Sequence, residues 1–190
     1  TEGITLTNNQ ILVGQGASES ISAIAGITLP PNSNPLPTTG GTNPVITNAN
    51  FAGSGIALAT GNIVRGVTVS NTLGAGIWGP GANNTTISET AVINAGGAAV
   101  YFQSAAITTT FTTLSTDGSQ SDGIVLNNVS GTFTVSGDTT VANSANEGIE
   151  IIDSTGLTAS FGNTTISDAG SLSINLRNNS GNITFGTTTM

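Results

Sequence analysis

The sequence repeats itself about every 25 residues, and this repeat constrains the fold more than any other feature. The segment Asp122–Thr140 reads DGIVLNNVSGTFTVSGDTT, and the segment Glu147–Thr165 reads EGIEIIDSTGLTASFGNTT. Both begin with an acid, Gly and Ile, and both have a second Gly eight residues after the first. A fixed period of this length is the signature of a protein that stacks one structural unit on the next.

A short motif, small–aliphatic–any–apolar, begins each repeat. Successive copies are separated by 21, 23, 24, 25 and 25 residues. The copies are Gly55–Leu58, Gly76–Gly79, Ala99–Phe102, Gly123–Leu126, Gly148–Ile151 and Ser173–Leu176. Their apolar residues alternate with a period of two, which predicts short strands and not helices.

Two further strands are expected in each repeat. One is marked by apolar residues spaced by 24, 26 and 24 positions: Phe111, Val135, Phe161 and Phe185. The other is marked by Val69, Val92, Leu114, Val141 and Ile166. Two positions after each of these apolar residues there is a polar residue: Asn71, Asn94, Thr116, Asn143 and Asp168. This column predicts a bend whose side chains form hydrogen bonds with the backbone of the next coil.

These patterns predict an all-β fold, a right-handed single-stranded parallel β-helix with three short strands per coil. We expect about six to seven coils of 21–26 residues, which at about 4.8 Å per rung form a rod roughly 30 Å long. Ile124, Ile149 and Ile174 should then share one interior column. Residues 1–190 are expected to form a single β-helix domain and to be a fragment of a longer array. The range 17–43, which contains four of the six Pro residues, is expected to be an insertion or an irregular early coil.

The sequence resembles the pectate-lyase-like superfamily of right-handed β-helices. The repeated motif carries this resemblance, together with NIVRGVTVSN at 62–71 and ITLTNNQILVGQG at 4–16. Lyases of this type use carboxylate-bound Ca²⁺ and an Arg or Lys base, and hydrolases use paired Asp beside a His and an Arg-x-Lys segment. This chain has no His and no Lys, and Arg65 and Arg177 are about five coils apart. We therefore assign no catalytic residue.

Charge is scarce and mostly negative. Only 6% of the residues are charged, against about 25% in typical soluble domains, and the formal net charge is −8. Nucleic acids and anionic membrane surfaces both require clustered cations, so neither is an expected partner. No apolar run is long enough to span a bilayer. The absence of Cys suits a bacterial surface protein, and we expect an extracellular or cell-surface location.

Three groups of residues are candidate binding sites. Trp78 and Tyr101 occur in adjacent coils, where exposed aromatic rings could stack on a sugar. A ladder of Thr side chains resembles the ice-binding face of solenoid antifreeze proteins: Thr108, Thr110, Thr132, Thr134 and Thr158. Three acids could form a weak Ca²⁺ site, because Glu147 should stack on Asp122 and Glu150 follows in the same coil; otherwise no cofactor is expected.

Three functions remain open at this stage. The first is a non-enzymatic structural or adhesive module of a secreted bacterial surface protein, such as an autotransporter passenger or a large adhesin. Its partner would be a host-surface or matrix component, a glycan or another adhesin chain. The second is a carbohydrate-binding or polysaccharide-cleaving β-helix protein. The third is ice binding through the Thr ladder.

Overall fold

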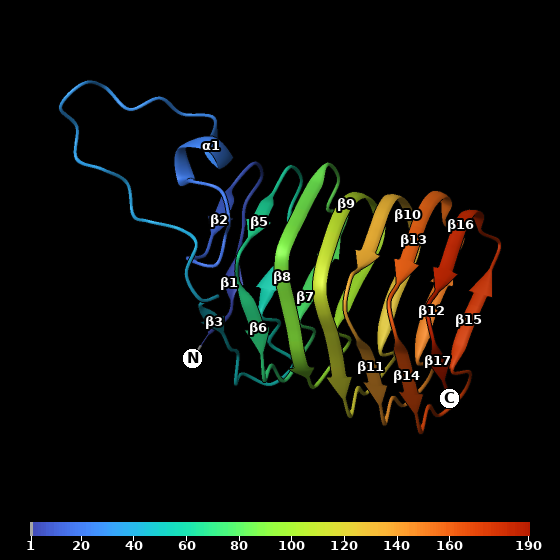
Figure 1. The fold of residues 1–190 in the computed structure, drawn as a ribbon. Helices are drawn as coiled ribbons and strands as arrows, with labels where there is room; N and C mark the ends of the chain where they lie inside the picture. The colour runs from blue at the N-terminus through green and yellow to red at the C-terminus, as the bar shows by residue number, and fades with distance from the viewer. Residues whose placement is uncertain (1) are drawn as a thin grey trace.

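The chain winds into a right-handed parallel β-solenoid of about six turns, which confirms the predicted all-β architecture (Figure 1). The structure is a computed structural model and describes residues 2–190. Every strand pairing in it is parallel, and each strand pairs with the strand of the neighbouring turn. The strands therefore form three faces that run the length of the rod.

The strands of the first face carry the repeated motif. They are β1 (Ile4–Thr5), β4 (Ile56–Ala57), β7 (Ile77–Pro80), β12 (Ile149–Ile152) and β15 (Ile174–Arg177), with the first parts of β9 (Val100–Asp117) and β10 (Ile124–Val135). The second face contains β2 (Ile11–Val13), β5 (Ile63–Arg65), β13 (Thr155–Phe161) and β16 (Ser180–Phe185), the start of β8 (Thr85–Ala95), the middle of β9 and the end of β10. The third face contains β3 (Val45–Ile46), β6 (Thr68–Ser70), β11 (Thr139–Ala142), β14 (Thr164–Ser167) and β17 (Thr188–Thr189), with the ends of β8 and β9.

Like side chains stack along the interior, as predicted. Ile124 pairs in register with Ile149, and Ile149 pairs with Ile174. The same column continues in the other direction through Val100, Ile77, Ile56 and Ile4. On the second face the rings of Phe111, Phe133, Phe161 and Phe185 follow one another with centroids 5.6, 5.3 and 4.8 Å apart. These columns of apolar side chains form the core of the fold, and their members near the two ends, Ile4, Ile174 and Phe185, are partly buried.

On the third face Val69, Val92 and Leu114 pair as predicted, and so do Val141 and Ile166, but the junction between these two groups departs from the predicted alignment by two residues. Leu114 lies opposite Thr139, and Val141 lies opposite Thr116 instead of Leu114. A shift of two keeps every side chain on the same side of the strand, so the apolar pattern cannot detect it. Two residues separate Phe111 from Leu114 and three separate Val135 from Thr139, so the pairing after the turn places Leu114 opposite Thr139, two residues before the expected Val141. Thr139 is on the same inward side of β11 as Val141 and is completely buried.

Polar residues with left-handed backbone form the bends. Asn71 and Asn94 both have positive φ, 51° and 55°, and the Asn94 amide donates to Asn71 Oδ1 at 2.9 Å. Side chains thus bond to each other across coils, where the sequence predicted bonds to the backbone. Thr116 does not belong to this column, because it is buried and donates to the carbonyl of Ala95. The structure contains a second column of bend residues that was not predicted. Its members lie at the corner after the first face and have φ of 52–54°: Ser104, Asn128, Asp153 and Asn178.

Small residues begin each repeat because two faces meet there. The Cα of Gly148 lies against the third face: a Cβ at this position would be 2.6 Å from Cγ2 of Ile166 and 2.5 Å from the carbonyl oxygen of Ser173. Gly123 faces Val141 in the same way one turn earlier. The small first position of the motif is thus a packing requirement at the corner between the third and first faces.

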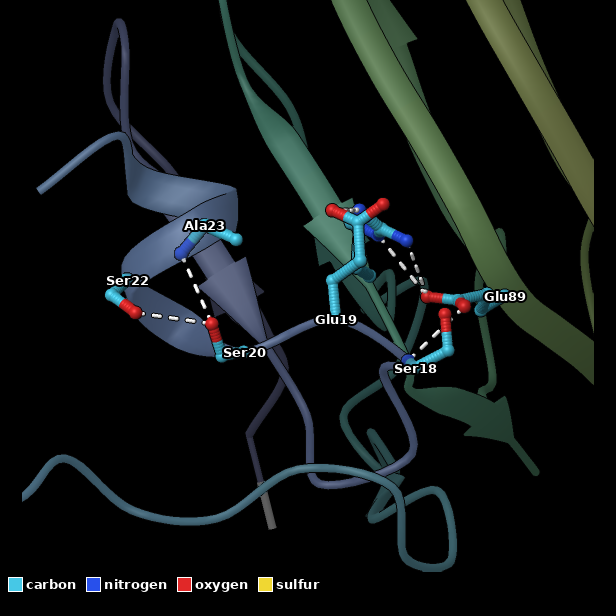
Figure 2. A network of polar contacts seen from close by, with 7 residues as sticks. Ser18, Glu19, Ser20, Ser22, Ala23 and Glu89 are labelled. Atoms are coloured by element: carbon cyan, nitrogen blue, oxygen red, sulfur yellow. Dashed lines mark hydrogen bonds and ion pairs between the residues drawn. The ribbon is translucent and has the colours of Figure 1, made fainter.

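Between β2 and β3 the chain leaves the rod in a long segment that contains a short helix, α1 (Ile21–Ala25) (Figure 1). An ion-pair network fixes the first part of this segment to the second face (Figure 2). Arg65 lies 2.8 Å from Glu19 and 3.0 Å from Glu89, whose other oxygen accepts a bond from the Ser18 N–H at 3.1 Å. Burial alone would raise the pKa of Glu89, but the bonds from Ser18 and Arg65 outweigh it and lower that pKa. Arg65 is therefore engaged in holding the insertion.

Within residues 2–190, no helix has the length and apolar character that crossing a membrane requires.

We predict that Gly148→Ala lowers the free energy of unfolding by about 1–3 kcal/mol, because the added methyl group overpacks the corner against a carbonyl that cannot move independently. Urea unfolding followed by circular dichroism would measure it. Ser173→Ala is the matched control, since the last repeat already carries a side chain at the equivalent position, and it should change stability by less than about 0.5 kcal/mol. Equal stability of Gly148→Ala and the parent would contradict this account of the motif.

Candidate functional site

Trp78 and Tyr101 project outward from the first face and stack on each other. They are register partners on β7 and β9, their ring centroids are 4.2 Å apart and their planes differ by 18°. Trp78 is 40% exposed, which is a large area for an apolar side chain that packs on a neighbour. By contrast Phe102, the next residue after Tyr101, is completely buried in the core. Trp78 and Tyr101 thus form a stacked aromatic pair on the outer side of the first face.

A groove of about 520 Å³ runs beside this aromatic pair. One wall is formed by Trp78 and Tyr101, and the other by small residues from the turns that precede the first-face strands. These include Ser54, Gly74, Ala75, Gly97, Ala98 and Ser121. Because the lining residues come from four successive turns, the groove is elongated along the rod axis. The small residues that the corner requires also leave the space that the groove occupies.

The three predicted acids lie just beyond the groove. Val125, which lines the groove, is the register partner of both Tyr101 and Glu150. Asp122 precedes it in the turn, and its Oδ1 accepts a bond from the backbone N–H of Glu147 at 3.1 Å. The structure therefore brings Asp122 and Glu147 together, as predicted, and places Glu150 on the adjacent strand.

Two of these acids, Glu147 and Glu150, have raised pKa values. The pKa of Glu147 is raised first by its hydrogen bond with the Asp122 side chain and second by burial. Burial is the main cause of the raised pKa of Glu150, and the negative charges of Asp122 and Glu147 add to it. Arg177 and a bond from Asn175 partly oppose this shift. The neighbouring Asp122 thus disfavours ionisation of Glu147, and loss of solvent is the main factor that disfavours ionisation of Glu150.

The acids do not form an arrangement suited to a metal ion. Across the part of the chain that the structure describes, no three Asp, Glu, His or Cys side chains are grouped so that they could hold one. A divalent cation needs several oxygen ligands that converge on one point. Ca²⁺ binding by Asp122, Glu147 and Glu150 therefore gains no support from this geometry.

The predicted Thr ladder lies on the second face. Thr108, Thr132 and Thr158 are register partners on successive turns, and all three are exposed. Thr110 and Thr134 form a parallel row two residues further along the strands. Thr86 extends the first row by one turn and was not predicted, because its strand is not marked by a Phe. The result is a flat, uncharged array of hydroxyl and methyl groups.

Sequence reasoning missed the groove itself. The turn residues that form its second wall are Gly, Ala and Ser, which carry no chemical signal of their own. The signal that could have found them is the register, because residues three or four positions before Trp78 and Tyr101 must lie beside these rings in a solenoid. Comparison with protein-family models, with curated proteins and with solved structures finds no match for this chain.

We predict that Glu150→Gln stabilises the protein at pH 7 and has no effect at pH 3. A carboxyl whose pKa is higher in the folded state destabilises that state only when ionised, so the penalty is absent below the unfolded pKa and complete above the folded one. Because the group is partly exposed, we expect a gain of less than about 1 kcal/mol. Thermal unfolding at the two pH values would measure the difference.

The control for this variant is Asp168→Asn, which also removes one negative charge but at an exposed position on another corner. It should not reproduce the gain. A stability of Glu150→Gln that is equal to the parent at pH 7, or a gain that persists unchanged at pH 3, would show that the acid cluster imposes no electrostatic cost.

Proposed function

We propose that this chain is a structural and adhesive β-helical module of a secreted bacterial cell-surface protein, related to the pectate-lyase-like superfamily and similar in role to an autotransporter passenger or a large adhesin. Its partner would be a host-surface or matrix component, a glycan or another adhesin chain. The location would be extracellular, on the bacterial surface.

The observation that carries this proposal is the unbroken in-register stack of turns. Each coil pairs with the next along three faces, and the interior column passes through all of them. Such a rod keeps its cross-section as turns are added, so it can hold a binding surface at a distance from its attachment point. A stalk or passenger needs this mechanical property, whereas a small enzyme does not.

The composition of the outer surface also supports this proposal. The exposed rows of the second face are mostly Thr and Ser, and the chain contains no Lys and no His. Hydrolases of similar fold rely on a His and an Arg-x-Lys segment, and lyases rely on an Arg or Lys base; here Arg65 is paired with Glu19 and Glu89. Neutral hydroxyl rows instead offer many weak hydrogen bonds over a large area, and adhesion can add these together.

Two assays in parallel would test the proposal. Beads coated with residues 1–190 should be retained on glycan-coated or matrix-coated surfaces at least about tenfold more than beads coated with an inert protein, since many weak contacts act together. Incubation with a panel of polysaccharides should release neither reducing ends nor unsaturated products. Turnover that is abolished by Glu150→Gln would overturn the proposal and establish an enzyme, and retention equal to that of inert beads would remove the adhesive role.

The Thr ladder supports ice binding as a second candidate function. A flat face with regularly spaced hydroxyl and methyl groups can match an ordered surface of water molecules, and here the rows repeat at the rung spacing of about 4.8 Å. The prediction is thermal hysteresis at millimolar protein that Thr132→Lys abolishes, because a long charged side chain disrupts the flat array. Thr165→Lys, on the exposed side of β14, is the control and should retain the activity. Absence of hysteresis in the parent protein would exclude this function.

A further inference from the structure

We propose that the groove beside Trp78 and Tyr101 binds a linear glycan with free amino groups, an oligomer of deacetylated amino sugars. This inference deepens the proposed adhesive function, because it names the site and the chemical class of one ligand. It is carried by the shape of the groove, by the aromatic ring that faces it and by the charge at its two ends.

A second, separate hollow lies next to the groove, toward the N-terminal end of the rod. This hollow of about 330 Å³ shares Ser54 with the first and is also lined by Glu2, Gly3 and Ala57. Thr5, Ala57, Trp78, Tyr101 and Val125 are successive register partners on the first face. Four intervals of about 4.8 Å place the far ends of the two hollows, at Thr5 and Val125, about 19 Å apart, and the two hollows together are called the trough below. A trough of this length accommodates a chain of several sugar rings lying parallel to the axis.

The accessible aromatic surface is on one side of the stack. Trp78 and Tyr101 cover each other's inner faces, and the outer face of Tyr101 is next to Val125, which is only 3% exposed. On the other side, the register partner of Trp78 is Ala57, whose side chain is a single methyl group, and Trp78 is 40% exposed. Sugar rings present flat C–H surfaces to exposed indole rings, and a nearby ammonium group gains further attraction from the same ring.

Negative charge is present at both ends of the trough. Glu2 lines the N-terminal hollow. Asp122, Glu147 and Glu150 lie at the other end, with Arg177 as the nearby cation that only partly offsets them. Asp122 approaches the backbone of Glu147, and Glu150 lies on the adjacent strand, so a cation bound there would be attracted by three neighbouring carboxylates. A polyanionic glycan would be repelled at both ends, whereas an amino-sugar oligomer is complementary in charge.

The surface favours a glycan over a basic peptide. Extended peptides gain affinity by adding a strand to a free sheet edge, but the floor of this trough is the outer face of a sheet whose backbone groups already pair between turns. The polar groups offered by the walls are the hydroxyls of residues such as Ser54 and Ser121. Hydroxyl groups exchange hydrogen bonds with sugar hydroxyls as both donor and acceptor.

Isothermal titration calorimetry with three soluble tetramers would test the inference. The glucosamine tetramer should bind at least about tenfold more tightly than the N-acetylglucosamine tetramer, and the galacturonate tetramer should not bind. Raising the salt concentration to about 0.5 M should weaken the glucosamine complex, because screening reduces the charge attraction. A lysine tetramer is included as the peptide probe and should bind more weakly than the glucosamine tetramer.

Four variants separate the site from general attraction to an acidic protein. Trp78→Ala should lower the affinity for the glucosamine tetramer at least about tenfold, and Glu150→Gln about threefold. Asp168→Asn and Thr165→Ala, outside the trough, should leave it unchanged. Unfolding midpoints for all four variants would show that each remains folded.

Three results would overturn the inference: affinity unchanged by Trp78→Ala, equal affinity for the acetylated and free-amine tetramers, or tighter binding of the lysine tetramer.

Bead retention distinguishes failure of this inference from failure of the proposed function. If the tetramers do not bind but the beads are retained, the adhesive module stands and its binding surface lies elsewhere. If the tetramers bind but the beads are not retained, the groove binds glycan without making the chain an adhesin.

Discussion

The rest of the structure depends on one constraint, which is that each turn pairs in register with the turn before it. The parallel backbone ladder uses the N–H and C=O groups of one turn to satisfy those of the next, so a residue's position along the turn fixes its neighbours above and below. Interior positions become columns, such as the one that joins Ile124, Ile149 and Ile174. Because apolar side chains of similar size stack in these columns, burial accumulates with each turn although no single turn has a core of its own.

The same constraint explains why the chain contains so few charges. An outward residue is repeated at about 4.8 Å in the next turn, and a column of like charges at that spacing would be strongly repulsive. The observed solution is to alternate an acid with an amide. Asn143 donates to Asp117 at 2.7 Å, and Asn163 and Asn178 donate to Asp138 and Asp153 in the same manner. Asp122 and Glu147 break this rule, and there the pKa of Glu147 is raised.

The sequence was sufficient to predict whatever the repeat encodes directly. The parallel ladder, the interior columns, the Thr rows and the approach of Glu147 to Asp122 all follow from positions that recur at one period. The alignment of Leu114 could not be predicted, because a shift of two residues preserves the apolar pattern and only the length of the turn between Val135 and Thr139 decides it. The groove was also missed, since its second wall consists of small residues whose role appears only when successive turns are placed side by side.

Binding information in such a rod lies where successive turns differ. A uniform column gives the same contact at every level and therefore cannot position a ligand along the axis. The outward row of the first face is not uniform: it changes from Ala57 to Trp78, Tyr101, Val125 and Glu150 within five turns. A small residue, a stacked aromatic pair and an acid thus follow one another at fixed spacing, beside a wall of small residues that the corner requires. The packing rule that makes the rod regular leaves this outward row free to vary, and its variation gives the groove a defined position, direction and charge.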